Sequence, residues 1–254
     1  MFHALLTKLL NTSRGLLAPS ADSCLVCRSP RAGSSGELSL CRRCYAGISW
    51  IKPNDIQCNV CGRFEVCPDC PRRKDTWFEF NLSIVRYDDV MKDWLGRFKY
   101  RGDEGLQLLF AGMFESLFLR FLAHQAWRKK DISVVTYVPL SKQRLEERGF
   151  NQAELFAQAL GTAFGIPVVA LLDRAQHTGK QSYKTREERI HDLRGVFVPN
   201  VEGVKWLSAN QPKQAQHVVV VDDVYTTGST MNECSRVIRA SAPHSRVFSL
   251  TWAR

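Results

Sequence analysis

Apolar runs alternate with amphipathic segments between residues 81 and 254. Short runs rich in β-branched residues predict strands over 81–87, 132–138, 168–172, 195–198, 217–221 and 246–252. Apolar residues at helical spacing predict helices over 90–100, 104–123, 151–164 and 231–240. Strands separated by helices of this length favour right-handed crossovers, so the predicted fold class is α/β with a mainly parallel sheet. Residues 200–216, rich in Gln, Asn, Gly and Pro, are expected to form a surface connection.

The amino-terminal twenty residues show a different pattern, with apolar residues on one face of a short helix. These residues are Phe2, Leu5, Leu6, Leu9 and Leu10. Lys8 interrupts the apolar run, which makes this a poor secretory signal, and no long apolar segment follows it. We therefore expect a cytoplasmic protein without stable membrane insertion. A chain of 254 residues is long enough for one well-buried domain and an appendage, with expected boundaries at 1–20, 21–75 and 76–254.

Eight of the nine cysteines form four C-x-x-C pairs within residues 21–75. The pairs are Cys24 with Cys27, Cys41 with Cys44, Cys58 with Cys61, and Cys67 with Cys70. Each pair can hold one metal from a tight turn, so four pairs predict two structural Zn2+ sites of four thiolates each. Both sequential and interleaved use of the pairs satisfy this spacing. A disulfide framework is disfavoured without a secretory signal, and no pair begins a helix after a strand as redox pairs do.

The formal net charge of +10 assumes neutral thiols. Two zinc sites with four thiolates each would add about −2 apiece, which brings the loaded protein near +6. Most of the remaining basic excess belongs to residues 76–254, where an anionic ligand would require it. Charge alone therefore does not establish a nucleic-acid partner.

The expected strand at 217–221 leads into two carboxylates and a hydroxyl-rich turn. Val218 to Val221 lack polar alternation, which indicates a strand buried on both faces. Asp222 and Asp223 follow at its carboxyl end, where ligands bind in parallel sheets. The turn residues, whose main-chain N–H groups and following helix favour an anion, are Thr226, Thr227, Gly228, Ser229 and Thr230. Carboxylates beside an anion site predict a phosphorylated sugar, and the absence of a G-x-x-x-x-G-K-[ST] motif disfavours a P-loop NTPase.

Two further charged segments are candidates for the same edge of the sheet. Lys142, Arg144 and Arg148 follow the strand expected at 132–138 and suit a group with several negative charges. Taken alone, such a mixed charge run is typical of a solvated face. The segment 98–103, Phe-Lys-Tyr-Arg-Gly-Asp, either covers the site or forms the exposed end of a helix.

The segment 218–230 resembles the signature of type I phosphoribosyltransferases. A Val-Pro pair and the run Arg-Gly-Phe-Asn-Gln at 148–152 extend the likeness to the ComF family, which covers residues 24–254. Further residues of this pattern are Arg174, Thr178, Gln181, Arg189, Gly195 and Phe197. Asp192 departs from it, because the family often has asparagine there.

The resemblance implies a double zinc ribbon over 21–75 and a type I phosphoribosyltransferase fold over 76–254, with a mainly parallel sheet flanked by helices. It implies that Asp222 and Asp223 hold the ribose hydroxyls of phosphoribosyl pyrophosphate (PRPP) and that residues 226–230 hold its 5-phosphate. Lys142, Arg144 and Arg148 would then face the pyrophosphate together with Mg2+. The family likeness also implies a role in handling incoming single-stranded DNA during natural transformation, alongside DNA-uptake proteins.

Two functions remain open at this point. One is a binding module that uses PRPP, a related phosphorylated ribose or a phosphorylated DNA end as its ligand. The other is an active phosphoribosyltransferase in which a nitrogen nucleophile displaces pyrophosphate from PRPP through an oxocarbenium-like state. No residue stands out as a base for the nucleophile. Candidates for DNA phosphate contacts are Lys99, Arg101, Lys142, Arg144 and Arg148, or alternatively Arg42, Arg43, Arg72 and Arg73.

Overall fold

The computed structural model describes residues 23–31, 38–175, 193–210 and 216–254. The helix expected over 1–20 lies outside these residues. So do four residues of the family pattern, Thr178, Gln181, Arg189 and Asp192.

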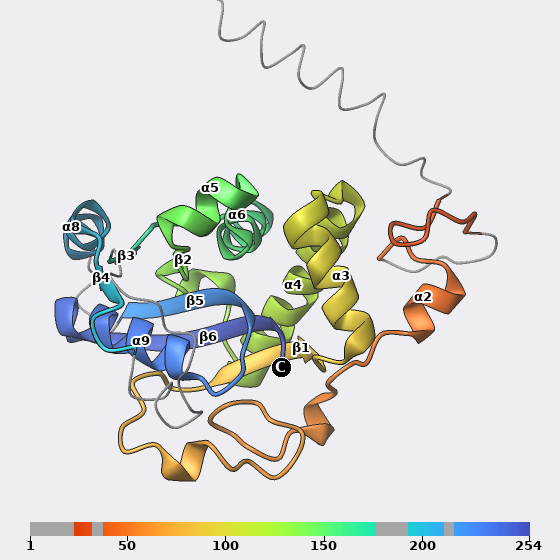
Figure 1. Ribbon diagram of the computed structural model, residues 1–254. Helices are drawn as coiled ribbons and strands as arrows, with labels where there is room; N and C mark the ends of the chain where they lie inside the picture. The colour runs from red at the N-terminus through yellow and green to blue at the C-terminus, as the bar shows by residue number, and fades with distance from the viewer. Residues whose placement is uncertain (1–22, 32–37, 176–192, 211–215) are drawn as a thin grey trace, which may run out of the picture.

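A sheet of four parallel strands forms the centre of the molecule, in the order β1-β6-β5-β2 (Figure 1). The strands are β1 (Asn81–Val85), β2 (Val134–Tyr137), β5 (Gln216–Val224) and β6 (Ser245–Ala253). Val218 to Val221 are fully buried between β6 and β2. Their burial on both faces confirms the expectation drawn from the missing polar alternation. The α/β fold class is likewise confirmed.

Helices cover both faces of this sheet (Figure 1). One core holds the inner sides of α3 (Asp89–Arg101), α4 (Glu104–Gln125) and α6 (Gln152–Phe164), packed on Val219 and Val221 of β5. Alternate residues of the same strand, Val218 and Val220, belong to a second core with α9 (Ser229–Ser241). The carboxyl end of β5 therefore opens between two packed helical layers.

The helix α4 is apolar enough along its 22 residues to cross a membrane by length and composition. Ten of its residues are buried, and they include Phe110, Phe114 and Phe118, which lie in the same core as the inner side of α6. Asp103 caps its first turn by accepting a hydrogen bond from the Gly105 N–H at 3.2 Å. Gly102, with a φ of 60°, ends α3 and lets the chain turn into α4.

Three predicted elements differ from the structure. The strands expected at 168–172 and 195–198 form a separate antiparallel pair, β3 (Leu172–Arg174) with β4 (Phe197–Pro199). Val168 itself makes only an isolated bridge to Val135. The surface connection expected over 200–216 was wrong for its first half, which is the helix α8 (Val201–Ala209). Asn200 caps α8 through the Gly203 N–H at 2.8 Å, and Leu207 is buried, so capping and packing override the polar composition.

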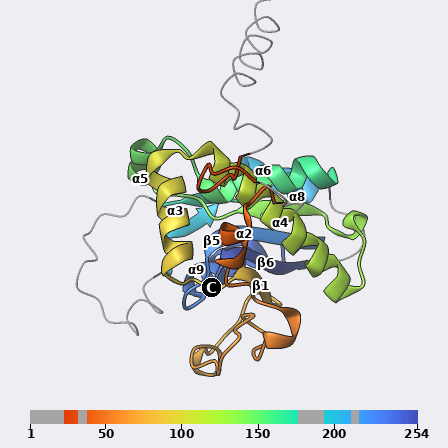
Figure 2. The same ribbon diagram turned by 90° about the vertical axis from the view of Figure 1, so that its right-hand side faces the viewer.

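The cysteine-rich region contains one short α-helix, α2 (Arg42–Ala46), and two 3-10 turns, η1 (Pro53–Asp55) and η2 (Cys70–Arg72). Its two halves contact different parts of the α/β domain (Figure 2). In the first half, the Val26 carbonyl accepts a hydrogen bond from Arg97 of α3 at 2.8 Å. In the second, the Cys61 carbonyl accepts one from Arg254, at the end of β6, at 2.9 Å. Each half is therefore anchored separately.

Candidate functional site

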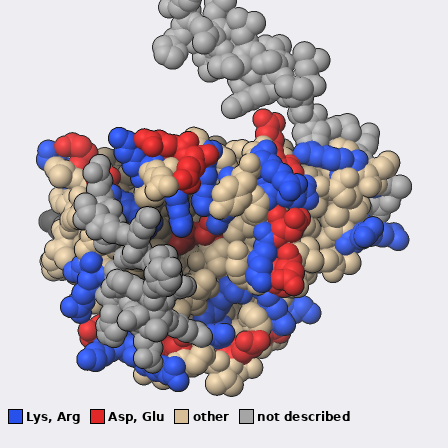
Figure 3. All heavy atoms as spheres, in the orientation of Figure 1, with Lys and Arg blue, Asp and Glu red and all other residues tan. Residues whose placement is uncertain are grey.

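A pocket lies at the carboxyl ends of β2 and β5. Six charged side chains line it: Lys99, Arg144, Arg148, Arg174, Asp222 and Asp223. They come from α3, the short helix α5 (Lys142–Arg148), β3 and β5. Figure 3 shows this side of the molecule as a hollowed surface with Lys and Arg side chains around the hollow. Four cations facing two carboxylates suit a ligand that carries both hydroxyl groups and several negative charges.

Asp223 forms an ion pair with Lys99. The two side chains are only 19% and 17% exposed, so α3 reaches into the pocket at this point. Tyr100, the next residue, is 74% exposed and lies beside the Arg148 guanidinium, 5.3 Å from the ring centre. The segment 98–103 thus supplies both a site residue and an exposed aromatic ring, which combines the two interpretations that the sequence left open.

Asp222 is the second carboxylate, and its Oδ1 accepts a hydrogen bond from the Asp223 N–H at 2.8 Å. Burial raises the pKa of Asp222 to about 8, and repulsion by Asp223 adds to the rise, while Lys99 and Arg174 oppose it. Ionising this carboxyl group costs free energy in the empty pocket. A ligand that stabilises the carboxylate charge offsets that cost. Sugar hydroxyls and divalent cations both do this.

The hydroxyl-rich segment 226–230 spans the turn after β5 and the first two residues of α9, Ser229 and Thr230. Gly228 is the N-cap residue before α9, with a φ of 79°, and a Cβ there would lie 2.0 Å from the Tyr225 hydroxyl oxygen. Both the conformation and the crowding therefore require glycine. Thr227 and Ser229 hydrogen-bond through their hydroxyls at 2.8 Å, and Thr230 lines the pocket beside the two aspartates. The thirteen-residue α9 directs its positive dipole end toward this turn.

Arg73 holds the turn from outside the pocket. Its Nη2 donates to the Thr227 carbonyl at 2.6 Å and lies 3.4 Å from the Tyr225 hydroxyl. The buried Tyr225 ring lies under the Arg254 guanidinium at 4.5 Å. Sequence reasoning missed this role of Arg73 and Tyr225, because their partners lie about 150 residues apart along the chain.

Only part of the predicted basic group reaches the pocket. Arg144 and Arg148 line it, four residues apart on one face of α5, and Arg148 also donates to Gln152 at 3.0 Å. Lys142 begins α5 on another face, with a 77% exposed side chain 3.9 Å from Glu146. Arg174 of β3 also lines the pocket, a role that the sequence analysis did not assign to it. Burial of the Arg174 guanidinium lowers its pKa, and repulsion by the nearby Arg144 is a second, smaller cause.

The eight paired cysteines form two groups of four. Cys24, Cys27, Cys41 and Cys44 form one, and Cys58, Cys61, Cys67 and Cys70 form the other, with all sulfurs of a group within 4.8 Å of one another. The pairs are thus used sequentially. The Sγ atoms of Cys27 and Cys41 lie 3.6 Å apart and those of Cys61 and Cys67 3.5 Å apart, near the separation of about 3.8 Å in a tetrahedral zinc site. Both groups therefore fit zinc.

No family model matches the chain. The Competence protein ComFC of Bacillus subtilis is 29% identical over 248 residues, which cover 94% of this chain and 87% of that protein. ComFC of Streptococcus pneumoniae is 28% identical, covering 83% and 86% of the two chains. The DNA utilization protein YhgH of Escherichia coli is 25% identical, covering 85% and 89%.

Among solved structures, an adenine phosphoribosyltransferase shares 14% identity with a TM-score of 0.34, covering 56% of this chain and 69% of that one. The Saccharomyces cerevisiae adenine phosphoribosyltransferase shares 16% identity with a TM-score of 0.32, covering 56% and 68%. Sequence similarity along 94% of the chain to one competence protein, and along 83% to another, makes this protein a homologue of the ComF competence proteins.

Proposed function

We propose that the protein binds PRPP or a related phosphorylated ribose and acts in handling incoming single-stranded DNA during natural transformation. The choice of ligand rests on the Asp222–Asp223 pair, which lies beside Thr230 and faces four cationic side chains. The names of its relatives, competence protein and DNA utilization protein, support the biological role. Eight thiols arranged for zinc favour a reducing compartment, which supports a cytoplasmic location.

Each part of the ligand has matching groups in this arrangement. The carboxylates of Asp222 and Asp223 accept hydrogen bonds from the ribose hydroxyls, and residues 226–230 hold the 5-phosphate. Arg144, Arg148 and Arg174 face the pyrophosphate. Mg2+, when bound, neutralises part of the pyrophosphate charge. Lys99 leaves Asp223 as the ligand arrives and remains available to the same polyanion.

The second candidate function is turnover. A nitrogen nucleophile would form a bond to the anomeric carbon while the bond to pyrophosphate breaks, and the nucleophile would lose its proton. Asp222 favours this reading, because its carboxylate, ionised when the ligand binds, lies beside Asp223 at the proposed ribose site, and the proton of the nucleophile can pass to the released pyrophosphate or to water. The carboxylate pair would also stabilise positive charge that develops on the ribose.

Calorimetry with PRPP, ribose 5-phosphate and unphosphorylated ribose, each with Mg2+, tests the proposal. Asp222→Asn and Asp223→Asn should each weaken PRPP binding by about 1–3 kcal/mol, because each removes a charged hydrogen-bond acceptor. Asp89→Asn is the control, since that carboxylate is 98% exposed on α3 and lies outside the pocket. Failure of both phosphorylated ligands to bind would refute the assignment. Pyrophosphate release across a panel of bases and amines separates turnover from binding.

A further inference from the structure

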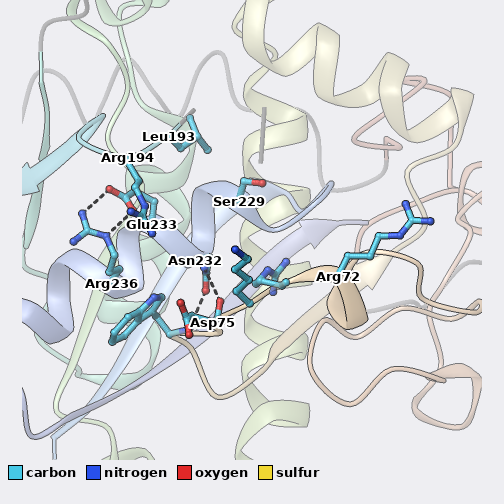
Figure 4. Close-up of a pocket in the computed structure, with 11 residues that line it drawn as sticks. Arg72, Asp75, Leu193, Arg194, Ser229, Asn232, Glu233 and Arg236 are labelled. Atoms are coloured by element: carbon cyan, nitrogen blue, oxygen red, sulfur yellow. Dashed lines mark hydrogen bonds and ion pairs between the residues drawn. The ribbon is translucent and has the colours of Figure 1, made fainter. Parts of the chain in front are cut away.

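A second basic pocket lies where the chain leaving the second cysteine group crosses α9 (Figure 4). Five cationic side chains line it against two acidic ones, Asp75 and Glu233. The cations are Arg72, Arg73, Lys74, Arg194 and Arg236. It shares no lining residue with the pocket at Asp222 and Asp223, since Ser229 faces this one and Thr230 the other.

The walls of this pocket are fixed by hydrogen bonds. Asn232 of α9 accepts from the Trp77 N–H at 2.9 Å and donates to the Asp75 carbonyl at 3.1 Å, which fastens the crossing segment to the helix. Glu233 accepts from the Gly195 N–H at 3.0 Å, which fastens the chain before β4. Figure 4 shows Asn232 directed at Asp75 and Glu233 directed at Arg236. The segment 72–77, the chain before β4 and α9 thus form one pocket whose walls are held together by hydrogen bonds.

These contacts leave a net positive pocket. Glu233 is neutralised by Arg236, which donates to it twice, at 2.7 and 2.8 Å. Within the described part of the chain, the side chains of Arg72, Lys74 and Arg194 make no ion pair. Arg73 donates to Thr227 through Nη2, while its buried Nη1 meets no hydrogen-bond acceptor among the described residues. Among the described residues that line the pocket, Asp75 is the carboxylate left to oppose them.

The chemistry of the lining indicates which anion it suits. Four of its five cations are arginines, whose planar guanidinium groups bind phosphate oxygens in pairs. Trp77 adds an aromatic ring to the same lining. Cationic groups that follow a backbone, combined with a ring on which a base can stack, are the features by which proteins hold single-stranded nucleic acid.

We propose that this second pocket binds the phosphodiester backbone of single-stranded DNA, separately from the ribose-phosphate pocket. The inference rests on the proposed role in DNA handling and gives that role a location. Of the two sequence-based candidates for DNA contacts, it departs from the group with Lys99, Arg144 and Arg148 and keeps Arg72 and Arg73 from the alternative group. The two pockets adjoin at the turn 226–230, where Ser229 lines one and Thr230 the other, but no residue lines both, so we expect both ligands to bind at once.

The test is fluorescence anisotropy with a labelled oligothymidylate of about 16 nucleotides, at several salt concentrations. The double variant Lys74→Glu/Arg194→Glu should bind about tenfold more weakly, with a logarithmic salt slope flatter by about 1.4 for two lost contacts. Lys129→Glu/Lys130→Glu is the charge-matched control, since these exposed lysines precede β2 at the opposite edge of the sheet. Equal affinity of the first variant and wild type would overturn the proposed location.

Further measurements distinguish the nature of the ligand. Trp77→Ala should weaken DNA binding without changing the salt slope, because stacking carries no charge, whereas an acidic peptide would be indifferent to the ring. A polyglutamate peptide that displaces the oligonucleotide at equal charge would overturn the assignment to nucleic acid. Saturating PRPP should leave DNA affinity unchanged, and competition would overturn the separation of the two sites.

Calorimetry on the same variants separates this inference from the proposed function. PRPP affinity should be unchanged in Lys74→Glu/Arg194→Glu. If wild type binds DNA and the variant binds it equally well, the location fails while DNA handling stands. If wild type binds no DNA even at low salt, both fail, and PRPP binding is judged from its own titration.

Discussion

Arg73 donates a 2.6 Å hydrogen bond from Nη2 to the main-chain carbonyl of Thr227. The N–H of the same residue donates to the Cys70 carbonyl at 3.2 Å, at the end of η2. One residue therefore joins the second cysteine group to the turn that precedes α9. Arg254 makes a parallel link, because it contacts both the Cys61 carbonyl and the Tyr225 ring. The shape of the turn thus depends on a metal-binding region outside the sheet.

Arg73→Lys tests this link. A lysine has no planar fork with which to contact Thr227 and Tyr225 together, so the turn should loosen. We expect ribose 5-phosphate binding to weaken by about 1–2 kcal/mol with zinc content unchanged, as calorimetry and elemental analysis would measure. Arg72→Lys, at the neighbouring position, is the control, because Arg72 makes no described hydrogen bond to the turn. Equal affinities for the two variants would show that Arg73 does not position the turn.

Metal content gives a second prediction. Two groups of four thiols should hold close to two zinc ions per chain, and Cys24→Ser and Cys58→Ser should each lose about one. Loss at the second group should weaken ribose 5-phosphate binding more, because Arg73 and Arg254 connect that group to the turn. The first group instead contacts α3 and the start of α4 through Arg97 and Arg28. Elemental analysis showing one zinc per chain in fresh, reduced wild type would contradict the two-site assignment.

Local patterns predicted the elements that their own residues determine. The apolar run at Val218 to Val221 predicted a strand buried on both faces, and the C-x-x-C pairs predicted two groups of four cysteines, as the structure has them. The helix α8 was missed because its stability comes from a cap at Asn200 and the burial of Leu207. Composition alone carries neither signal.

Residues that depend on distant partners were harder to assign. Lys142, Arg144 and Arg148 have the same charge, and only the phase of α5 separates the two that line the pocket from the one that does not. Arg174 and Arg73 reach the site from β3 and from the segment after Cys70. Their roles arise from tertiary packing, which no spacing in the chain encodes.

The raised pKa of Asp222 predicts that ligand affinity depends on pH. In the free protein this carboxyl is protonated below about pH 8, while PRPP binding uses its ionised form. Affinity for PRPP should therefore rise as pH increases from 7 toward 8, by up to about tenfold per unit. The ligand's own phosphates, with pKa about 6, are already ionised in this range. Calorimetry across this range measures the slope, and Asp222→Asn should remove it.

The same shift predicts the opposite trend for the stability of the empty protein. In the unfolded chain Asp222 ionises near its ordinary pKa of 3.8, whereas the fold keeps the proton until about pH 8. Between these values the folded state binds more protons, so the contribution of Asp222 to stability decreases as pH rises. Thermal unfolding without ligand should show a larger drop in Tm toward pH 8 for wild type than for Asp222→Asn. Identical profiles would mean that Asp222 ionises normally in the fold.

The ion pair between Lys99 and Asp223 provides the last prediction. Lys99 opposes the rise in the pKa of Asp222, so Lys99→Met should raise that pKa further and move the pH dependence of PRPP binding to higher pH. The variant also removes a cation that the bound polyanion would contact, so affinity should fall at every pH. Arg144→Met separates these two effects. It removes a pocket cation that is not among the largest causes of the shift at Asp222, and it should therefore lower affinity while moving the profile less than Lys99→Met does. A profile displaced equally in both variants would show that Lys99 acts through overall charge rather than through its contact with the acidic pair.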